Sequence, residues 1–246
     1  MFLEILSTKK NILRSDVLSG MIDVHTHLLP GVDDGVRDKE EAFEALGFLK
    51  EAGVQKVCFT PHMMADLSRN RPDVLREKFE AFNDECPVQI GLQLAGEYML
   101  DQGFLSQLRQ GLLTMADNHV LIETSYMAPP PDLYQLLYEL EVSGYKPILA
   151  HPERYLYMRE KEYTLLKEKG CKFQLNLFSL AGYYGKMVQR NAKTLLKQQM
   201  YDFAGSDFHH LDGYNKGLHS CMLTSSQLKD LQQVISNNRL LWKCDE

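Results

Sequence analysis

Residues 21–35 read Met-Ile-Asp-Val-His-Thr-His-Leu-Leu-Pro-Gly-Val-Asp-Asp-Gly, and this stretch decides the fold and the chemistry expected of the chain. Met21 and Ile22 are apolar and β-compatible, so they predict a strand that ends at the two histidines. Residues two apart project to the same face of a strand, which points His25 and His27 at one object. Neutral imidazole is a good ligand for Zn, Mn, Fe or Ni, so the pair indicates a metal ion. A single His-x-His pair is weak evidence, and the rest of the chain decides.

The composition is that of a globular protein with one large core: 246 residues, 44% hydrophobic and 24% charged. The chain lacks the run of about eighteen apolar residues that a transmembrane helix needs. Its charges at Lys9, Lys10 and Arg14 follow a short apolar start, which is the wrong order for a secretory signal. The five scattered cysteines form no Cys-x-x-Cys pair, which favours reduced thiols in a cytoplasmic protein.

The net charge of −6, without a block of Lys and Arg, argues against a surface that binds nucleic acid. It does not argue against an anionic substrate, because bound divalent cations can supply positive charge locally.

Short β-branched apolar runs alternate with amphipathic stretches, the pattern of repeated strand–helix units. The expected strands are residues 21–25, 54–59, 88–95, 119–123, 146–150, 171–176 and 202–206. The expected helices are residues 38–52, 71–83, 131–143, 155–169, 180–199 and 226–238. This alternation predicts an α/β protein with a barrel of parallel strands, whose chemistry gathers at the carboxyl ends of the strands.

Side chains that can bind metal follow nearly all of the expected strands. The candidate ligands are the five histidines and four carboxylates His25, His27, Asp34, His62, Glu97, Glu123, His151, Asp207 and His209. One ion takes about four to six donors, so two or three divalent ions fit this set better than one. The sixth strand ends instead at Asn176, a poor ligand, and Asp33 competes with Asp34 as the loop carboxylate.

Arg154 follows His151 by three residues and lies at the same expected edge. A guanidinium can hold two phosphate oxygens at once, so Arg154 is the candidate phosphate ligand, with an ion pair to Glu153 as the alternative. An aromatic wall around the site could come from Tyr126, Tyr155, Tyr183 and Tyr184. The remaining histidines, His119, His210 and His219, are expected to lie outside the site.

With these residues in place, the chain resembles the PHP (polymerase and histidinol phosphatase) superfamily, and within it the bacterial manganese-dependent protein-tyrosine phosphatases of the CpsB/CapC type. The motifs that carry the resemblance are D-V-H-T-H-L-L-P-G-V-D-D-G (23–35), T-P-H (60–62), G-E (96–97), I-E (122–123), A-H-P-E-R (150–154) and S-D-F-H (206–209). The resemblance implies a distorted (β/α)₇ TIM-like barrel, the PHP fold, with a trinuclear site held by the nine candidate ligands. Manganese is favoured over iron or zinc. Residues 21–246 are expected to form one catalytic domain, and residues 1–20 an N-terminal extension that could serve a homo-oligomer contact.

The function that the resemblance implies is hydrolysis of phosphotyrosine on the tail of a bacterial tyrosine kinase that drives capsule or exopolysaccharide export. A metal-activated hydroxide would attack phosphorus while Arg154 holds the phosphate, with Asp207 and His209 also in the catalytic centre. The tyrosyl group leaves readily, because the pKa of phenol is about 10. No covalent phospho-cysteine is expected, because no cysteine is followed by arginine at Cys-x₅-Arg spacing.

Two alternatives stay open at this stage. The first is another metallo-phosphoesterase, such as a histidinol-phosphate phosphatase or a proofreading exonuclease, although an exonuclease would be expected to show a basic groove. The second is a non-catalytic module in which metal ions only stabilise the fold.

Overall fold

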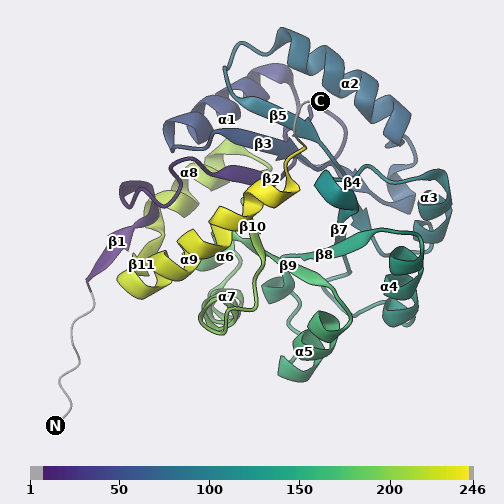
Figure 1. The fold of residues 1–246 in the computed structure, drawn as a ribbon. Coiled ribbons are helices and arrows are strands. Elements are labelled where there is room, and N and C mark those ends of the chain that lie inside the picture. The colour runs from purple at the N-terminus through teal and green to yellow at the C-terminus, as the bar shows by residue number, and fades with distance from the viewer. Residues whose placement is uncertain (1–7, 244–246) are drawn as a thin grey trace.

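Two sheets of parallel strands lie at the centre of the computed structural model, which describes residues 8–243 apart from the side chains of residues 212, 214 and 215 (Figure 1). The larger sheet has the order β10-β9-β8-β7-β6-β4, and the smaller has the order β2-β3-β5. Their strands are β2 (Ile22–Thr26), β3 (Lys56–Phe59), β4 (His62–Met63), β5 (Gly91–Leu94), β6 (Glu97–Met99), β7 (His119–Glu123), β8 (Lys146–Ala150), β9 (Lys172–Asn176) and β10 (Phe203–Gly205). The predicted α/β class with parallel strands is confirmed.

The chain steps from the smaller sheet to the larger one twice, and each step places a candidate ligand. β3 and β4 flank Thr60-Pro61, while β5 and β6 flank Ala95-Gly96. A proline has no N–H for a strand ladder, so pairing is interrupted at Pro61. β3 pairs with β5 before the step, and β4 pairs with β6 after it. The second pairing sets His62 directly opposite Glu97.

Backbone hydrogen bonds also join β2 of the smaller sheet to the segment that follows β10. The Asp207 N–H donates to the His25 carbonyl at 2.8 Å, and the His27 N–H donates to the Phe208 carbonyl at 2.8 Å. The buried Asn238 side chain holds the same two strands together. It accepts from the Ala204 N–H at 3.1 Å and donates to the carbonyls of Ala204 at 2.6 Å and Ile22 at 2.7 Å.

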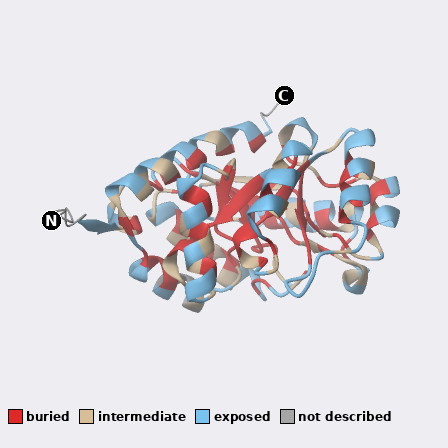
Figure 2. Cartoon of the chain, turned by 90° about the horizontal axis from the view of Figure 1, so that it is seen from below, coloured by how far each residue is buried: buried red, intermediate tan, exposed pale blue. Residues whose placement is uncertain are grey.

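Helices lie around the sheets, with their buried faces turned inward (Figures 1 and 2). They are α1 (Lys39–Glu51), α2 (Pro72–Glu85), α3 (Phe104–Gln110), α4 (Leu133–Val142), α5 (Glu160–Glu168), α6 (Leu177–Ala181), α7 (Lys186–Lys197), α8 (Leu211–Ser220) and α9 (Ser225–Asn237). All six expected helical regions contain helix, but residues 180–199 do not form one helix. Gly182 and Gly185 adopt φ values of +84° and +94°, which separate α6 from α7.

One helix boundary and two whole helices also differ from the sequence prediction. Helix α5 begins at Glu160 and not at residue 155, because residues 152–154 form a 3-10 turn after β8. Helices α3 and α8 were not predicted, because α3 has only seven residues and the two glycines of α8 lower its helix propensity.

The described part of the predicted extension packs on the rest of the chain. β1 (Lys9–Asn11) pairs antiparallel with β11 (Met222–Thr224), a pairing that the sequence did not indicate. The Asn11 side chain donates to the carbonyls of Leu218 and His219 at 3.0 Å, and Ile12 is buried in the core. The division of the chain at residues 20 and 21 stays a prediction.

We predict that replacing Asn238 by alanine lowers the free energy of unfolding by about 2–3 kcal/mol, because buried backbone groups on two strands lose their partner. The control is Asn237→Ala, which removes a single hydrogen bond to the Asp202 carbonyl and should cost about 1 kcal/mol. Urea unfolding followed by circular dichroism measures both values. Equal losses in the two variants would contradict this role of Asn238.

Candidate metal centre

The nine predicted ligands lie together at the carboxyl ends of the strands. They form four overlapping groups, and within each group the ligand atoms lie within 4.8 Å of one another. The groups are His27, Asp34, His62 and His209; His25, His27 and Glu97; His25, His151 and Asp207; and His62, Glu97 and Glu123. Because several residues belong to two groups, one side chain could serve two ions.

Two buried carboxylates stand at the middle of this cluster. Glu97 Oε2 lies 3.3 Å from the Nε2 atoms of both His25 and His27, and 3.1 Å from His62 Nδ1. Asp207 Oδ1 lies 3.3 Å from the same two Nε2 atoms. Each carboxylate oxygen therefore faces several imidazole nitrogens at once.

The donor set fits divalent metal ions. Glu97 Oε2, Glu123 Oε1 and His62 Nδ1 are buried and form no hydrogen bond of acceptable geometry with the described residues. His62 Nδ1 is nevertheless only 2.9 Å from Glu123 Oε1. Buried polar atoms are normally hydrogen-bonded. These three atoms lie close together without such bonds, which indicates that their lone pairs point at one common position, as the ligands of a metal ion do. Mixed imidazole and carboxylate ligation suits Mn, Fe or Zn.

Neighbouring side chains orient two of the histidines. The Nδ1 atom of His25 lies 2.9 Å from Gln174 Oε1, and that of His27 lies 2.8 Å from Asp33 Oδ2. Each contact leaves Nε2 facing the cluster, which is the usual arrangement around a metal-binding histidine. Asp33 also accepts from the backbone N–H groups of His62 and Gly35. The sequence indicated Asp33 only as an alternative to Asp34 as the metal-binding carboxylate of the loop. It gave no indication that Gln174 would contact His25.

Asp34 itself lies at the exposed side of the cluster. Its Oδ1 atom is 3.4 Å from His62 Nε2 and 3.5 Å from His209 Nε2. Gly35 is required beside it, because a Cβ there would lie 2.1 Å from the His27 carbonyl oxygen. The tight turn thus separates the roles of the two neighbouring aspartates.

The electrostatics of the cluster lower the pKa of Asp207 and Glu97 but raise that of Glu123. Burial opposes ionisation of Asp207, but His25 and the other nearby imidazoles outweigh it and hold the pKa of Asp207 well below its usual range. Burial and then Glu97 raise the pKa of Glu123. Burial and then Arg154 lower the pKa of His151 to about 4, which favours the neutral imidazole that binds metal.

Two of the predicted ligands have a left-handed backbone. His151 has φ +35° and Asp207 has φ +56°, a region of backbone conformation that residues other than glycine seldom adopt. Such strain is often found at functional sites, where the surrounding structure holds the residue in place.

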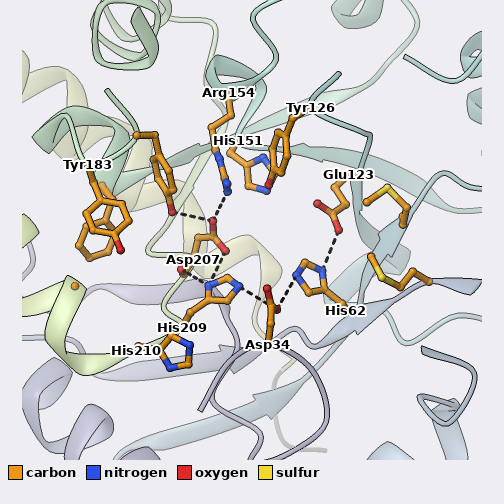
Figure 3. Close-up of a pocket in the computed structure, with 15 residues that line it drawn as sticks. Asp34, His62, Glu123, Tyr126, His151, Arg154, Tyr183, Asp207, His209 and His210 are labelled. Carbon is orange, nitrogen blue, oxygen red and sulfur yellow. Dashed lines mark hydrogen bonds and ion pairs between the residues drawn. The ribbon is translucent and has the colours of Figure 1, made fainter. Parts of the chain in front are cut away.

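Arg154 stands above the cluster in a pocket of about 400 Å³ (Figure 3). Its Nη1 atom donates to Asp207 Oδ2 at 2.9 Å. The guanidinium carbon lies 4.3 Å from the ring centre of Tyr126 and 4.1 Å from that of Tyr184. The alternative ion pair with Glu153 is wrong, because that carboxylate is buried and accepts hydrogen bonds from elsewhere.

Asp207 Oδ2 is held by more than Arg154. Asn176 Nδ2 donates to it at 2.8 Å, and the Tyr184 hydroxyl lies 3.4 Å away. Glu153 in turn accepts from the Asn176 N–H at 3.0 Å and from the Tyr201 hydroxyl at 2.9 Å. From the sequence, Asn176 was expected only to be a poor metal ligand, and its position at a strand end was the one signal of its role.

The predicted aromatic wall forms in part. Tyr126, Tyr183 and Tyr184 line the pocket. Tyr155 does not, because it is fully buried, and its hydroxyl oxygen accepts a hydrogen bond from the Thr124 N–H at 3.1 Å. His210 also lines the pocket, although its Nδ1 atom faces Glu41 at 3.3 Å.

The other two excluded histidines lie apart from the pocket. His119 Nδ1 bonds the Ala116 carbonyl at 2.9 Å, at the start of β7. His219 is exposed and belongs to α8, not to the loop that was expected.

Comparison with known proteins adds an independent line of evidence. A family model described as "Capsular polysaccharide synthesis, CpsB/CapC" matches residues 21–236. The tyrosine-protein phosphatase YwqE of Bacillus subtilis (strain 168) is 32% identical over 205 residues, which is 79% of this chain and 80% of that protein. The tyrosine-protein phosphatase CpsB of Streptococcus pneumoniae is 27% identical over 208 residues, 78% of this chain and 84% of that protein.

Solved structures agree with the sequence matches. A chain from crystal structures of YwqE and CpsB, described as "unique metal-dependent tyrosine phosphatases", has a TM-score of 0.78 and 28% identity. That match covers 90% of this chain and 94% of the solved chain. The lactonase Lmo2620 from Listeria monocytogenes, with a TM-score of 0.57 and 10% identity, shares the fold alone.

We predict that replacing Asp33 by asparagine weakens metal binding about 10- to 100-fold, because the His27 imidazole loses the carboxylate that orients it. Titration of chelator-treated protein with Mn²⁺ in a calorimeter measures the affinity. Asp38→Asn is the control, since Asp38 only caps helix α1. Unchanged affinity in Asp33→Asn would show that His27 needs no such support.

Proposed function

The chain belongs to the CpsB/CapC family of capsular polysaccharide synthesis proteins, and on this premise we propose that it is a metal-dependent protein-tyrosine phosphatase. The observation that carries the proposal is the placement of Arg154 in an aromatic-lined pocket, next to the cluster of histidines and carboxylates. Relatives named as tyrosine-protein phosphatases support the same reading.

We also propose that the strands close into the distorted (β/α)₇ barrel expected from the sequence. When β3–β4 and β5–β6 are each taken as one interrupted strand, the order runs from β2 to β10. The backbone hydrogen bonds between β2 and the end of β10 support closure of this ring.

The four overlapping ligand groups support a site for up to three ions, with the nine named residues as ligands. Manganese is the ion that the family resemblance favours, and iron or zinc would suit the same donors. Divalent ions bound there would lower the pKa of a coordinated water and offset the charge of a phosphate group.

Arg154 is the proposed phosphate ligand. Its Nη1 atom is engaged by Asp207, and the rings of Tyr126 and Tyr184 lie on its guanidinium, so its orientation is set before substrate arrives. The remaining N–H groups can donate to phosphate oxygens, where negative charge accumulates during transfer.

Asp207 and His209 complete the proposed catalytic centre. The donors on Asp207 Oδ2 leave its Oδ1 atom directed at the cluster. His209 Nδ1 lies 2.9 Å from the Asp207 carbonyl, which turns Nε2 toward the pocket side near Asp34. The tyrosyl leaving group has a pKa of about 10 and needs little protonation to depart.

The pocket suits an aromatic phosphate ester. Apolar side chains from Met64, Met99 and Phe178 line it together with the tyrosines, so a phenyl ring would find apolar surface beside the phosphate ligands. The comparisons do not favour a small-molecule phosphatase or a non-catalytic module.

The proposed substrate is a phosphotyrosine-bearing protein, such as the tail of a bacterial tyrosine kinase. Among the described residues, no helix combines the length and apolar character needed to cross a membrane. The cytoplasmic location and the homo-oligomer stay predictions.

We predict manganese-dependent hydrolysis of a phosphotyrosine peptide, with much slower turnover of a phosphoserine peptide and of histidinol phosphate. Phosphate release by chelator-stripped protein, with and without Mn²⁺, measures all three. The Asp207→Asn variant should lose activity, whereas Cys86→Ser should keep it because no thiol takes part. Faster turnover of histidinol phosphate than of the phosphotyrosine peptide would agree with the proposed metal chemistry but contradict phosphotyrosine as the substrate.

We predict that Arg154→Lys lowers kcat/KM for the phosphotyrosine peptide about 10²- to 10³-fold, since lysine cannot reproduce the oriented guanidinium. Arg109→Lys, on the exposed face of α3, is the matched control and should behave as the parent. Steady-state kinetics at saturating Mn²⁺ compares them. Parental activity in Arg154→Lys would remove Arg154 from the mechanism.

A further inference from the structure

Helix α7 carries a row of cations that the metal centre does not use. Lys186, Arg190, Lys193 and Lys197 recur at intervals of four, three and four residues, so they share one face of the helix. They line a groove of about 820 Å³ together with polar residues of α7 and with Gln227 from the first turn of α9. No carboxylate is among the residues that line this groove.

This basic groove is electrostatically unbalanced. Within the described part of the chain, none of its four cations forms an ion pair with a carboxylate, whereas Lys167 and Lys172 both pair with Asp202. Burial lowers the pKa of Lys193, while Cys221 raises it and Lys9 of β1 lowers it by a smaller amount. An unpaired positive row in a chain of net charge −6 favours an anionic partner.

The basic groove begins next to the pocket. Tyr183 and Tyr184 line the pocket, Gly185 is the N-cap of α7, and Lys186 is the first residue of the helix. From there α7 runs for 12 residues, or about 18 Å at 1.5 Å per residue. An extended peptide rises about 3.3 Å per residue, so roughly six residues would span the row.

We propose that the basic groove of α7 binds an acidic segment of the phosphoprotein whose phosphotyrosine occupies the pocket. The inference rests on the proposed function and adds a substrate class to it. Carboxylates or phosphates about three to nine residues from the phosphotyrosine would meet Arg190, Lys193 and Lys197. Such contacts lie outside the reacting centre, so they raise the rate of productive encounter more than the rate of chemistry.

The test compares two phosphotyrosine peptides of equal length, one with glutamates and one with glutamines three to nine residues from the phosphotyrosine. Each peptide is made in two versions, with its glutamates or glutamines on the N-terminal or on the C-terminal side of the phosphotyrosine. The test variant is Arg190→Gln/Lys193→Gln/Lys197→Gln. The control variant is Lys50→Gln/Arg76→Gln/Lys78→Gln, which removes the same charge from exposed positions on α1 and α2, away from α7 (Figure 1).

We predict that the parent prefers the acidic peptide in at least one orientation by about tenfold in kcat/KM at low salt. The preference should disappear in the α7 variant, persist in the control variant, and shrink in the parent as salt rises. Hydrolysis of para-nitrophenyl phosphate, which cannot reach the groove, should be equal in all three proteins.

Equal preference in the parent and the α7 variant would overturn the inference while leaving the phosphatase intact. Failure of the parent to hydrolyse any phosphotyrosine peptide would overturn the proposed function together with the inference. Sedimentation with phosphatidylglycerol vesicles separates a membrane partner from a peptide. Vesicle binding that the α7 variant loses, without any peptide preference in the parent, would overturn the inference in favour of a membrane surface.

Discussion

The structure depends on two carboxylates, Glu97 and Asp207, that are buried among histidines. A buried ionised carboxylate is costly unless cations or hydrogen bonds surround it. Here the imidazoles of His25 and His27 approach both carboxylates at 3.3 Å. His25 lies in β2, and His27 directly follows it. The step from β5 to β6 places Glu97, and the backbone hydrogen bonds between the end of β2 and the segment after β10 place Asp207. The topology therefore brings the two carboxylates to the histidines.

The two carboxylate oxygens of Asp207 contact different groups of residues. Its Oδ1 atom faces the histidines, and its Oδ2 atom accepts from Arg154 and Asn176. Glu153 supports the second group by accepting from the Asn176 N–H. The proposed phosphate ligand Arg154 is therefore linked to the proposed metal site through the Asp207 carboxylate. A substitution at either place should alter the geometry of the other.

The strand ends could be predicted from the sequence because their signals are local. Alternation of apolar runs located the strands, and the parallel arrangement then gathered His62, Glu123 and His151 at one edge. The roles of Gln174 and Asn176 could not be predicted, since each depends on the approach of a residue from a distant strand. The β1–β11 pair could not be predicted for the same reason. The single helix expected over residues 180–199 was wrong, because Gly182 and Gly185 adopt positive φ values and separate α6 from α7.

We propose that the histidines and carboxylates form one multinuclear metal site. The most direct measurement is a crystal structure of the Mn²⁺-loaded protein, with anomalous scattering recorded on both sides of the manganese edge. We expect separate manganese peaks beside Glu97 and beside Asp207, with His25 and His27 among their ligands. Anomalous density confined to the exposed Asp34, or absent from the cluster at saturating Mn²⁺, would contradict this proposal.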